Sequence, residues 1–497
     1  MTESSTHAPL TVIVLAAGEG TRMRSRSTPK VLHGFAGRSL LGHALAATEG
    51  LGAQVTAVVI GHRRDEVAAH LHQISPAAIG VVQEQQNGTG HAVRVALAEI
   101  ERVTGQPITG TVLVLPGDAP LLTPASLAGL LAEHAAGEAA ATLLTSVVPD
   151  PTGYGRVIRS AAAPDRVDRV VEHRDASPEE LRVAEVSALV YAFDAGLLRA
   201  AVGRLSTDNA QGEEYLPEVV SILVAERRAV LARLAPAYET AGVNDRVQLA
   251  AAHRAYNTRL LEEHMRAGVT VIDPASTWVD AGVVIEPDAV LHPNVQLHGA
   301  TRIGRDAVVG PESTLTDTEV GPGSVLQRTV ATRARVGAGV TVGPFAYLRP
   351  GTVLHDQAHI GTYVELKASE VGTGSKVPHL SYVGDATIGE HTNIGAATVF
   401  VNYDGVHKHR SVIGDHARTG ADNMFIAPVR VGDGAYTAAG SVISSDVPPG
   451  ALGVGRARQR NVAGWVLRRR AGTAAAQAAE VAGAADQDAS DSGSNQA

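Results

Sequence analysis

The chain of 497 residues contains no cysteine and is poor in several other features. The lack of cysteine excludes disulfides, thiolate metal sites, iron–sulfur clusters and a cysteine acyl-enzyme. Aromatic residues make up only 3%, so any core must be built from Val, Leu, Ile and Ala. Basic residues are outnumbered, since 42 Lys and Arg stand against 51 Asp and Glu, a net charge of −9. Because a negative net charge does not attract the phosphate backbone, we expect no nucleic-acid partner.

Long apolar runs are also missing from the sequence. No stretch reaches ~18 uninterrupted apolar residues, the length of a membrane-spanning helix, and residues 1–9 lack the apolar segment of a signal peptide. We therefore expect no membrane partner and a cytoplasmic location. A hydrophobic content of 44% suits a protein of two or more domains.

The second half of the chain, from about residue 283 to 443, repeats every six residues. A period of six matches neither a helix nor a half-buried strand, and it is typical of a solenoid in which each hexad forms one side of a triangular coil. Inward-pointing residues, apolar apart from two threonines, are expected at Ile285, Leu291, Leu297, Ile303, Val309 and Leu315, then at Val336, Val342, Leu348, Leu354, Ile360 and Leu366, and again at Ile413, Thr419, Phe425, Val431, Thr437 and Ile443.

The first half of the chain alternates strand, loop and helix patterns. Apolar runs predict strands at residues 10–16, 54–60 and 111–115, with helices between them at 39–50 and 91–103. This alternation predicts an α/β domain with a Rossmann-like, mostly parallel sheet covered by helices.

The expected domain organisation follows from where these patterns change. Apolar residues at helical spacing predict one long helix over residues 245–268, and the end of the chain lacks apolar periodicity, which predicts disorder. The expected units are an α/β domain at 1–246, a helical linker at 247–267, a repeat domain at 268–470 and a disordered tail at 471–497.

A loop of small residues follows the first predicted strand and reads Ala17-Gly18-Glu19-Gly20-Thr21-Arg22, with Pro29-Lys30 further on. Small residues at a strand's carboxyl end let backbone amides approach an anion, and Arg22 and Lys30 add positive charge. Taken alone, the pattern is a weak signal that favours a plain tight turn over a nucleotide site. It lacks both the GK[ST] of the Walker loop and the third glycine of the dinucleotide fingerprint.

Further polar motifs in the same half make the case stronger, among them Gln83 to Gly90, the strand end Pro116-Gly117-Asp118, Tyr154-Gly155-Arg156, Val171-Glu172 and Gly242-Val243-Asn244. Together these motifs resemble those of the sugar-nucleotidyltransferases. The resemblance implies that a sugar 1-phosphate attacks the α-phosphorus of UTP and expels pyrophosphate, and that Mg²⁺, Arg22 and Lys30 offset the charge. It implies UTP and nucleotide-sugar contacts at Leu15, Ala16, Ala17, Gly18, Lys30, Gln83, Gly88, Thr89, Gly155, Glu172, Ser187 and Asn244, and Mg²⁺ ligands at Asp118 and Asn244.

Two features of this half depart from the family pattern. The loop at residues 24–28 is one residue longer than usual, which bears on where Lys30 points. Ser187 stands where the family usually has asparagine, so a short hydroxyl replaces an amide, and we expect a weaker or altered grip on the sugar.

Polar residues interrupt the six-residue repeat in one region, in runs such as Val377-Pro378-His379-Leu380-Ser381-Tyr382 and Asn402-Tyr403-Asp404-Gly405. These runs look like the acetyltransferase half of the bifunctional N-acetylglucosamine-1-phosphate uridylyltransferase/glucosamine-1-phosphate N-acetyltransferases, and both halves together resemble that family over roughly residues 10–465. The resemblance implies that His379 is the general base, a role suited to imidazole because its pKa lies near neutrality. It implies sugar-phosphate contacts at Arg349, Lys367, Tyr382 and Asn393, acetyl-CoA contacts at Ala396, Asn402, Tyr403, Ala421, Ala439 and Arg456, and a further contact at Lys408.

The resemblance also implies the order of reactions and the assembly. Glucosamine 1-phosphate would be acetylated by acetyl-CoA and the product joined to UMP, giving UDP-N-acetylglucosamine for cell-wall peptidoglycan synthesis. The coils would form a left-handed parallel β-helix that packs as a homotrimer. Ala421 stands where the family commonly has serine, so we expect one hydrogen bond fewer to acetyl-CoA, about 1 kcal/mol.

Two alternatives stay open from the sequence. The first is a nucleotidyltransferase with a single activity, whose solenoid serves only to assemble it. The second is a regulatory subunit that binds a nucleotide sugar without turnover. The presence of Lys30, Asp118 and Asn244 argues against the second alternative.

Overall fold

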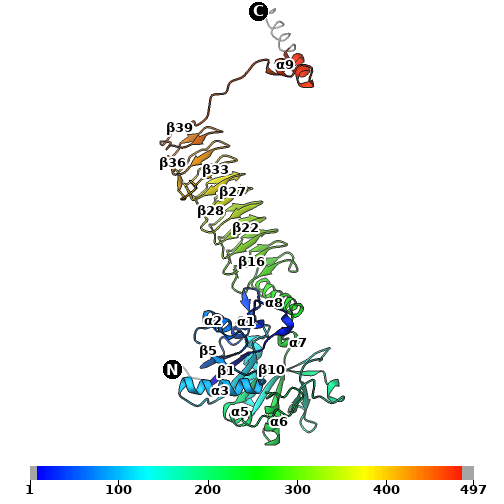
Figure 1. Cartoon of the computed structure of the whole chain (residues 1–497). Helices are drawn as coiled ribbons and strands as arrows, with labels where there is room; N and C mark the ends of the chain where they lie inside the picture. Colours follow the sequence, from blue (N-terminus) through cyan, green and yellow to red (C-terminus); the bar gives the residue numbers. More distant parts are fainter. Residues whose placement is uncertain (1–7, 484–497) are drawn as a thin grey trace, which may run out of the picture.

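The computed structural model describes residues 8–483. An α/β layer at the amino-terminal end is followed by a long column of short strands (Figure 1). Within residues 8–483, no helix is both long and apolar enough to span a membrane. Residues 484–497 of the predicted disordered tail lie outside the described residues, and residues 474–483 are helical.

The amino-terminal sheet has nine strands, seven of which follow the order β11-β7-β10-β6-β1-β4-β5. Along this order, neighbouring strands pair in parallel, except that β10 runs antiparallel to both β6 and β7. The sheet is therefore mixed, with parallel pairs in the majority along this path. Its strands are β1 (Leu10–Ala16), β4 (Val55–Ile60), β5 (Ile79–Val82), β6 (Thr111–Pro116), β7 (Ala141–Val147), β8 (Arg156–Arg159), β9 (Val167–Val171), β10 (Glu185–Asp194) and β11 (Val230–Leu234).

Helices cover both faces of this sheet because alternate residues of the buried strands point to opposite sides. Ile13 of β1 belongs to the core under α3, α5 and α6, whereas Val12 and Val14 belong to the core under α1, α2 and α4. The helices are α1 (Leu40–Ala46), α2 (Arg64–Ile74), α3 (Thr89–Thr104), α4 (Pro124–Ala136), α5 (Ala195–Val202), α6 (Glu218–Ala225) and α7 (Ala237–Thr240), with short 3-10 helices η1 (Thr21–Met23), η2 (Lys30–Leu32) and η3 (Glu180–Arg182) and a hairpin of β2 (Gly34–Phe35) and β3 (Arg38–Ser39).

The long helix α8 (Arg246–Arg266) joins the two halves. It begins where the Asp245 side chain accepts a hydrogen bond from Gln248 N, a normal N-cap. On one side, Tyr256 of α8 packs with Phe35. On the other side, the buried Asn257 amide donates to Thr277 O at 2.8 Å and accepts from Val279 N at 3.0 Å, which ties the helix to the first coil of the solenoid.

The solenoid is a prism with three parallel sheets along its sides. The first sheet contains β12 (Thr270–Val271), β15 (Val290–Leu291), β18 (Val308–Gly310), β21 (Val325–Gln327), β24 (Thr341–Val342), β27 (His359–Thr362) and β30 (Lys376–His379), and β37 (Tyr436–Thr437) pairs with β39 (Leu452–Gly453) further along. The second contains β13 (Trp278–Val279), β16 (Gln296–His298), β19 (Thr314–Thr316), β22 (Thr329–Thr332), β25 (Ala346–Leu348), β28 (Glu365–Lys367), β31 (Tyr382–Gly384), β33 (Val399–Val401), β35 (Met424–Ile426) and β38 (Val442–Ile443). The third contains β14 (Val284–Ile285), β17 (Arg302–Ile303), β20 (Glu319–Val320), β23 (Arg335–Val336), β26 (Val353–Leu354), β29 (Glu370–Val371), β32 (Ala386–Ile388), β34 (Ser411–Ile413) and β36 (Val429–Val431).

The repeat residues form the core of this prism, as the six-residue period predicts. All the apolar positions of the three series are buried, and Thr419 and Thr437 are 6% and 5% exposed. Ile285 pairs with Ile303 on the next coil, 18 residues on, so three hexads make one turn. Where the sequence period lapses, after Leu315, the coils continue with shortened sides through the buried Val320, Leu326 and Ala331.

The chain leaves the prism once in its later coils, at residues 402–410, between β33 and β34. Ile388 and Ile413 still pair on adjacent coils, 25 residues apart, so the extra residues project outward as a loop. Beyond β39 the chain runs on to a short helix, α9 (Trp465–Arg469), away from the prism (Figure 1).

Candidate active sites

The first site is built where two neighbouring parallel strands of the α/β sheet end. β1 ends at Ala16 and β6 at Pro116, and Gly117 N donates to Leu15 O at 2.8 Å, so the loops after both strands lie together. Ala17 O accepts hydrogen bonds from the Gln86 side chain at 2.8 Å and from His62 N at 3.3 Å. This is the edge of an open α/β sheet at which ligands bind.

Two basic residues and two oxygen-bearing residues gather at this edge. Lys30 Nζ donates to Asp118 Oδ2 and, at 2.8 Å, to Asn244 Oδ1. Arg22 Nη2 donates to the same Asn244 oxygen at 2.7 Å. Val243 N also donates to Asp118 O at 2.8 Å, which holds the segment before α8 against the loop that follows β6. Lys30 therefore reaches the predicted metal ligands, whatever the effect of the expected extra residue in its loop.

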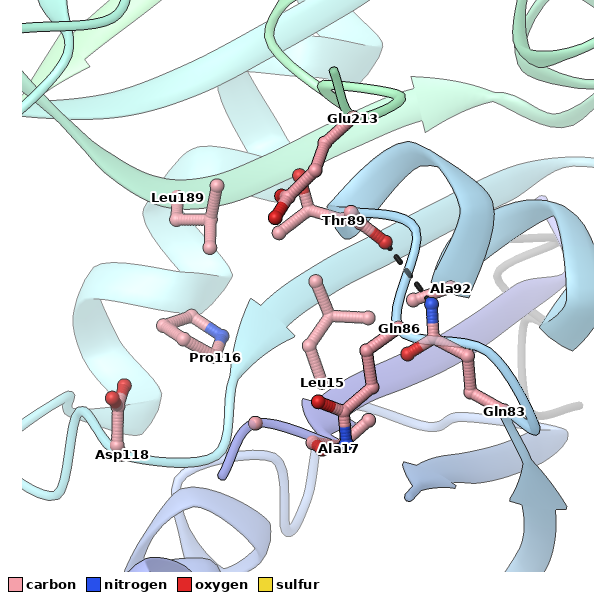
Figure 2. A pocket seen from close by; sticks show the side chains of 12 residues that line it. Leu15, Ala17, Gln83, Gln86, Thr89, Ala92, Pro116, Asp118, Leu189 and Glu213 are labelled. Carbon is pink, nitrogen blue, oxygen red and sulfur yellow. Dashed lines mark hydrogen bonds between the residues drawn. The ribbon is translucent and has the colours of Figure 1, made fainter. Parts of the chain in front are cut away.

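A cavity of about 320 Å³ has Asp118 of this cluster in its lining, and Figure 2 shows the side chains around it. Gln83 donates its side-chain amide to Gly88 O at 3.1 Å, and Thr89 Oγ1 accepts from Leu216 N at 3.0 Å. Gly88 has φ 105°, and a Cβ there would lie 2.5 Å from Glu214 O, so only glycine fits. The cavity is lined by Leu15, Ala17, Gly18, Gln83, Gln86, Gly88, Thr89, Ala92, Pro116, Asp118, Leu189 and Glu213.

Six of the twelve predicted nucleotide-sugar contacts line the cavity, together with the predicted metal ligand Asp118 and five residues outside the predicted set. Ala16 is buried in the core below it. The five residues outside the predicted set are Gln86, Ala92, Pro116, Leu189 and Glu213. Gln86 lay within a motif that was recognised, whereas Glu213 comes from a loop without any readable pattern.

The predicted sugar residues Gly155, Glu172 and Ser187 lie near one another. Ser187 N donates to Gly155 O at 2.9 Å, and a Cβ on Gly155 would lie 3.5 Å from Glu172 Oε1. Burial, together with the nearby Asp175 and Glu213 carboxylates, raises the pKa of Glu172. Since Glu213 lines the cavity, this acidic group adjoins it.

Ser187 itself is already engaged within the protein. Its hydroxyl lies 2.9 Å from the Tyr191 hydroxyl and accepts from Leu189 N at 3.3 Å. The register of β10 shifts between Ser187 and Val190, and Leu189 has φ 57°. This irregularity turns Leu189 toward the cavity, where it is one of the lining residues.

The second site follows one corner of the prism. Lys376, Asn393, Arg418 and Tyr436 occupy equivalent places on four successive coils. Three residues after each of them come His379, Ala396, Ala421 and Ala439, which therefore form a column along the corner. Hydrogen bonds continue the stacking, from Ala397 N to His379 O, from Asp422 N to Ala396 O and from Gly440 N to Ala421 O. The predicted base and three predicted acetyl-CoA contacts thus share one line.

His379 stands at the start of this column with an exposed side chain. Within the described residues 8–483, no hydrogen bond to its ring is found, so the imidazole is accessible. At the other end, Arg456 Cδ lies 3.8 Å from where a Cβ on Gly440 would be, beside Ala439.

The next side of the prism carries the predicted sugar-phosphate residues. Leu348 pairs with Leu366, which places Arg349 beside Lys367 on the next coil, and Glu365 pairs with Tyr382. Arg349 Nη1 donates to Glu365 Oε1 at 2.9 Å. The charge of Lys367 lowers the pKa of Lys408, because the two ammonium groups are close. Two adjacent cations with a third nearby are suited to holding a phosphate.

The projecting loop brings Asn402 and Tyr403 to the same side. Asn402 donates to the Asp385 carboxylate and, at 3.4 Å, to the Tyr382 hydroxyl. Tyr403 pairs with Lys408 in an antiparallel bridge, so the loop is a tight hairpin. Asp404 closes it. Hydrogen bonds from His407 N, the His409 ring and Val406 N lower the pKa of Asp404 to about 2.

Asn393 lies apart from the other sugar-phosphate residues. It lines a groove of about 370 Å³ with Gly374, Lys376, His391, Thr392 and Arg418. This groove is on the preceding side of the prism, three residues before the column that contains Ala396. Within residues 8–483, the Asn393 side chain makes no hydrogen bond to Lys367 or Tyr382.

Comparison with known proteins agrees with both halves. Residues 12–181 match the family model described as the MobA-like NTP transferase domain. Proteins named Bifunctional protein GlmU are similar along nearly the whole chain. The one from Streptomyces avermitilis is 57% identical over 95% of this chain and 97% of its own length. That from Thermobifida fusca is 57% identical over 96% and 98%, and that from Streptomyces coelicolor is 55% identical over 95% and 97%.

Such identity across both the α/β half and the prism exceeds what a shared fold alone produces, and the chain belongs to the GlmU family of bifunctional proteins.

Proposed function

We propose that the chain catalyses two consecutive reactions of UDP-N-acetylglucosamine synthesis. Acetyl-CoA first acetylates glucosamine 1-phosphate, and the product then reacts with UTP to give UDP-N-acetylglucosamine and pyrophosphate. The observation that carries this proposal is the presence, in one chain, of the Lys30–Asp118–Asn244 cluster beside a cavity and of His379 at the head of a column of small residues. The relatives' printed name, bifunctional, supports two activities.

In the acetyl-transfer step, the amine nitrogen of glucosamine 1-phosphate attacks the thioester carbon of acetyl-CoA. A C–N bond forms, the C–S bond breaks, and the coenzyme A thiolate leaves. His379 accepts the proton that the amine loses, since its ring is exposed and free of hydrogen bonds in the described residues. The absence of cysteine, which excludes a cysteine acyl-enzyme, supports direct transfer within a ternary complex.

The substrates of this step would occupy two adjoining subsites. We assign the phosphate to Arg349, Lys367 and Lys408, and the sugar to Tyr382 and Asn393. We assign acetyl-CoA to the column and loop residues Ala396, Asn402, Tyr403, Ala421, Ala439 and Arg456. Alanines and glycines along the column leave an unobstructed strip for a long, thin donor.

In the uridylyl-transfer step, a phosphate oxygen of N-acetylglucosamine 1-phosphate attacks the α-phosphorus of UTP. A P–O bond forms there, and the bond to the β-phosphate breaks to release pyrophosphate. Arg22 and Lys30 offset the negative charge, while Gln83, Gly88 and Thr89 hold the base and Gly155, Glu172 and Ser187 face the sugar. Positioning and electrostatics are sufficient for this chemistry.

Mg²⁺ fits the donor set of this site. The Asp118 carboxylate and the Asn244 amide oxygen both face the Lys30 ammonium, so one positive group already lies between them. Mg²⁺ prefers such oxygen ligands and commonly takes one or two from protein and the rest from phosphates and water. Asp118 and Asn244 would hold the ion, which would neutralise triphosphate charge. Within residues 8–483, no cluster of three or more acidic, His or Cys residues offers another site.

The two alternatives are less well supported. A purely structural solenoid would require neither the accessible His379 at the head of the alanine column nor the grouping of Lys367 and Asn402 around Asp385 on the next side of the prism. A regulatory subunit without turnover would not require Lys30 to be held between Asp118 and Asn244.

We further propose a cytoplasmic homotrimer with its acyl sites between neighbours, and the division into residues 1–246, 247–267, 268–470 and 471–497. An exposed apolar ridge supports the assembly. Phe345 and Tyr363 stack with ring centroids 5.2 Å apart, and Leu380 next to His379 is 61% exposed.

Two assays on the purified full-length chain test the proposal. Free coenzyme A should appear when acetyl-CoA and glucosamine 1-phosphate are mixed with it, and pyrophosphate should appear from UTP and N-acetylglucosamine 1-phosphate with Mg²⁺. Inertness in the first assay with turnover in the second would leave the single-activity alternative. Inertness in both would leave the regulatory one.

A further inference from the structure

Asp385 lies between the residues assigned to the two substrates of acetyl transfer. Its carboxylate accepts hydrogen bonds from Lys367 Nζ, at 3.1 Å to Oδ1 and 3.0 Å to Oδ2. The same carboxylate accepts a hydrogen bond from Asn402 Nδ2. The side chains of Lys367 and Asp385 are each 19% exposed, so this ion pair is partly shielded from water.

The prism's register produces this arrangement. Lys367 pairs with Gly384, which places Asp385 at the corner directly after the Lys367 coil, and Asp385 N donates to Lys367 O at 2.9 Å. A Cβ on Gly384 would lie 2.6 Å from Asn402 Nδ2, so only glycine there lets Asn402 reach the carboxylate. Ser411 N donates to Asp385 O at 3.2 Å, which anchors the returning end of the projecting loop.

We infer that Asp385 is a positioning residue for acyl transfer, because its single carboxylate holds Lys367 of the sugar-phosphate subsite and Asn402 of the acetyl-CoA subsite at once. This inference rests on the proposed acetyltransferase function. Asp385 was not among the residues that the sequence singled out.

The physical role follows from the two side chains it holds. A lysine has a long, flexible side chain, and fixing it before the substrate arrives lowers the entropy lost on binding. Although burial opposes ionisation, hydrogen bonds from Lys367 and Asn402 keep the pKa of Asp385 low, and Asp385 in turn raises the pKa of Lys367. Both groups are therefore charged wherever imidazole can act as a base.

The chain supplies a matched control in Asp317. Asp317 occupies the same corner of the prism four coils earlier, as the backbone hydrogen bonds between successive corners show. Its φ is 48° against 50° for Asp385. Its carboxylate accepts only a backbone hydrogen bond, from Ala300 N at 3.0 Å, among the contacts of the described residues. Asparagine tolerates the left-handed conformation, so Asp→Asn preserves the backbone at both corners.

The experiment compares Asp385→Asn with Asp317→Asn in the full chain, with each acetyl-transfer substrate varied in turn. In Asp385→Asn one carboxylate oxygen becomes an NH₂ group, which cannot accept from either donor. We expect KM to rise about fivefold or more for both glucosamine 1-phosphate and acetyl-CoA, the scale of losing a charge-assisted hydrogen bond. Asp317→Asn should match the wild type, and uridylyl transfer should be unchanged in both variants.

Three results would overturn the inference. The KM values of Asp385→Asn could match those of Asp317→Asn, only one of the two could rise, or kcat alone could fall, as a smaller folded fraction would produce. Failure of the proposed function looks different, because the wild-type chain would then release no coenzyme A at all.

Discussion

Lys30 Nζ lies 2.8 Å from Asn244 Oδ1, although the two residues are 214 positions apart in the chain. The lysine begins η2, and the asparagine precedes the linker helix α8. The same ammonium also contacts Asp118, so three separate segments of the α/β domain converge on one charged group. The triphosphate and metal site that we propose is therefore tied to the correct packing of all three segments.

Asp118→Asn should raise the Mg²⁺ concentration that gives half-maximal pyrophosphate release, because a neutral amide oxygen binds Mg²⁺ more weakly than a carboxylate. Chelation of Mg²⁺ should stop this reaction and leave acetyl transfer intact. Asp168→Asn, on β9, is the matched control. An unchanged Mg²⁺ dependence in Asp118→Asn would show that Asp118 is not a metal ligand.

His379→Ala should lower the rate of acetyl transfer by about 10²–10⁴-fold, the usual contribution of a general base. Uridylyl transfer should persist, because the two sites lie in different folds. His292→Ala, in an early coil, serves as the control for loss of a histidine from the prism. If acetyl transfer survives in His379→Ala at the control rate, another group accepts the proton.

Ser187→Asn should change KM for N-acetylglucosamine 1-phosphate, because an amide offers the sugar both a donor and an acceptor. The serine hydroxyl is already paired with Tyr191 Oη at 2.9 Å. Steady-state pyrophosphate release at varied sugar phosphate measures the effect. An identical KM in the two proteins would remove Ser187 from the sugar site.

Ala421→Ser should tighten acetyl-CoA binding several-fold, since one added hydrogen bond is worth about 1 kcal/mol. Ala421 belongs to the corner column, and its carbonyl is already used by Gly440 N. Calorimetric titration with coenzyme A compares the variant with the wild type. Weaker binding would mean that the added hydroxyl obstructs the donor.

The stability of the junction between the halves should fall as the pH drops below 6.5. His43 is buried between Phe35 and Tyr256, with ring centroids 4.4 and 4.6 Å away. Burial, with smaller contributions from the charges of Arg38 and Arg259, lowers the pKa of His43 from 6.5 to about 4. Between pH 6.5 and pH 4, the His43 side chain is therefore protonated in the unfolded chain and neutral in the folded chain. This difference lowers the free energy of unfolding by about 3 kcal/mol by pH 4.

His43→Gln removes this titration and should flatten the pH dependence. The thermal unfolding midpoint of the wild-type chain should fall more between pH 7 and pH 5 than that of His43→Gln, with His72→Gln on the exposed face of α2 as the control. Parallel curves for all three proteins would contradict the role assigned to His43.

Local patterns in the sequence predicted the fold well, because the forces that form it are local. Residues 10–16 form the first strand as expected, and the repeat positions from Ile285 onward are buried since each coil packs only on its neighbours. The shortened coils after Leu315 were not predicted. In these coils Val320 and Ala331 are still buried in the core of the prism, although they do not follow the six-residue spacing.

Site residues were harder to predict from the sequence where their role depends on a neighbour from another coil or loop. Asp385 looks like any corner aspartate in the sequence, and only the register places it against Lys367 and Asn402. Glu213 lines the nucleotide cavity from a loop with no periodicity. The groups brought together at Lys30 could be expected only from family resemblance, because no spacing links residues so far apart.

The projecting loop at residues 402–410 does not disturb the stacking of the coils, because Ile413 after it still pairs in register with Ile388 on the adjacent coil. Changes in the length or composition of the exposed tip, residues 404–407, therefore leave the buried core of the prism unchanged. Because Asn402 and Arg410 at the two ends of the loop bond the underlying coils, the freedom to vary belongs to the exposed tip at residues 404–407, where an engineer can graft a foreign turn at the rim of the proposed acyl-transfer site.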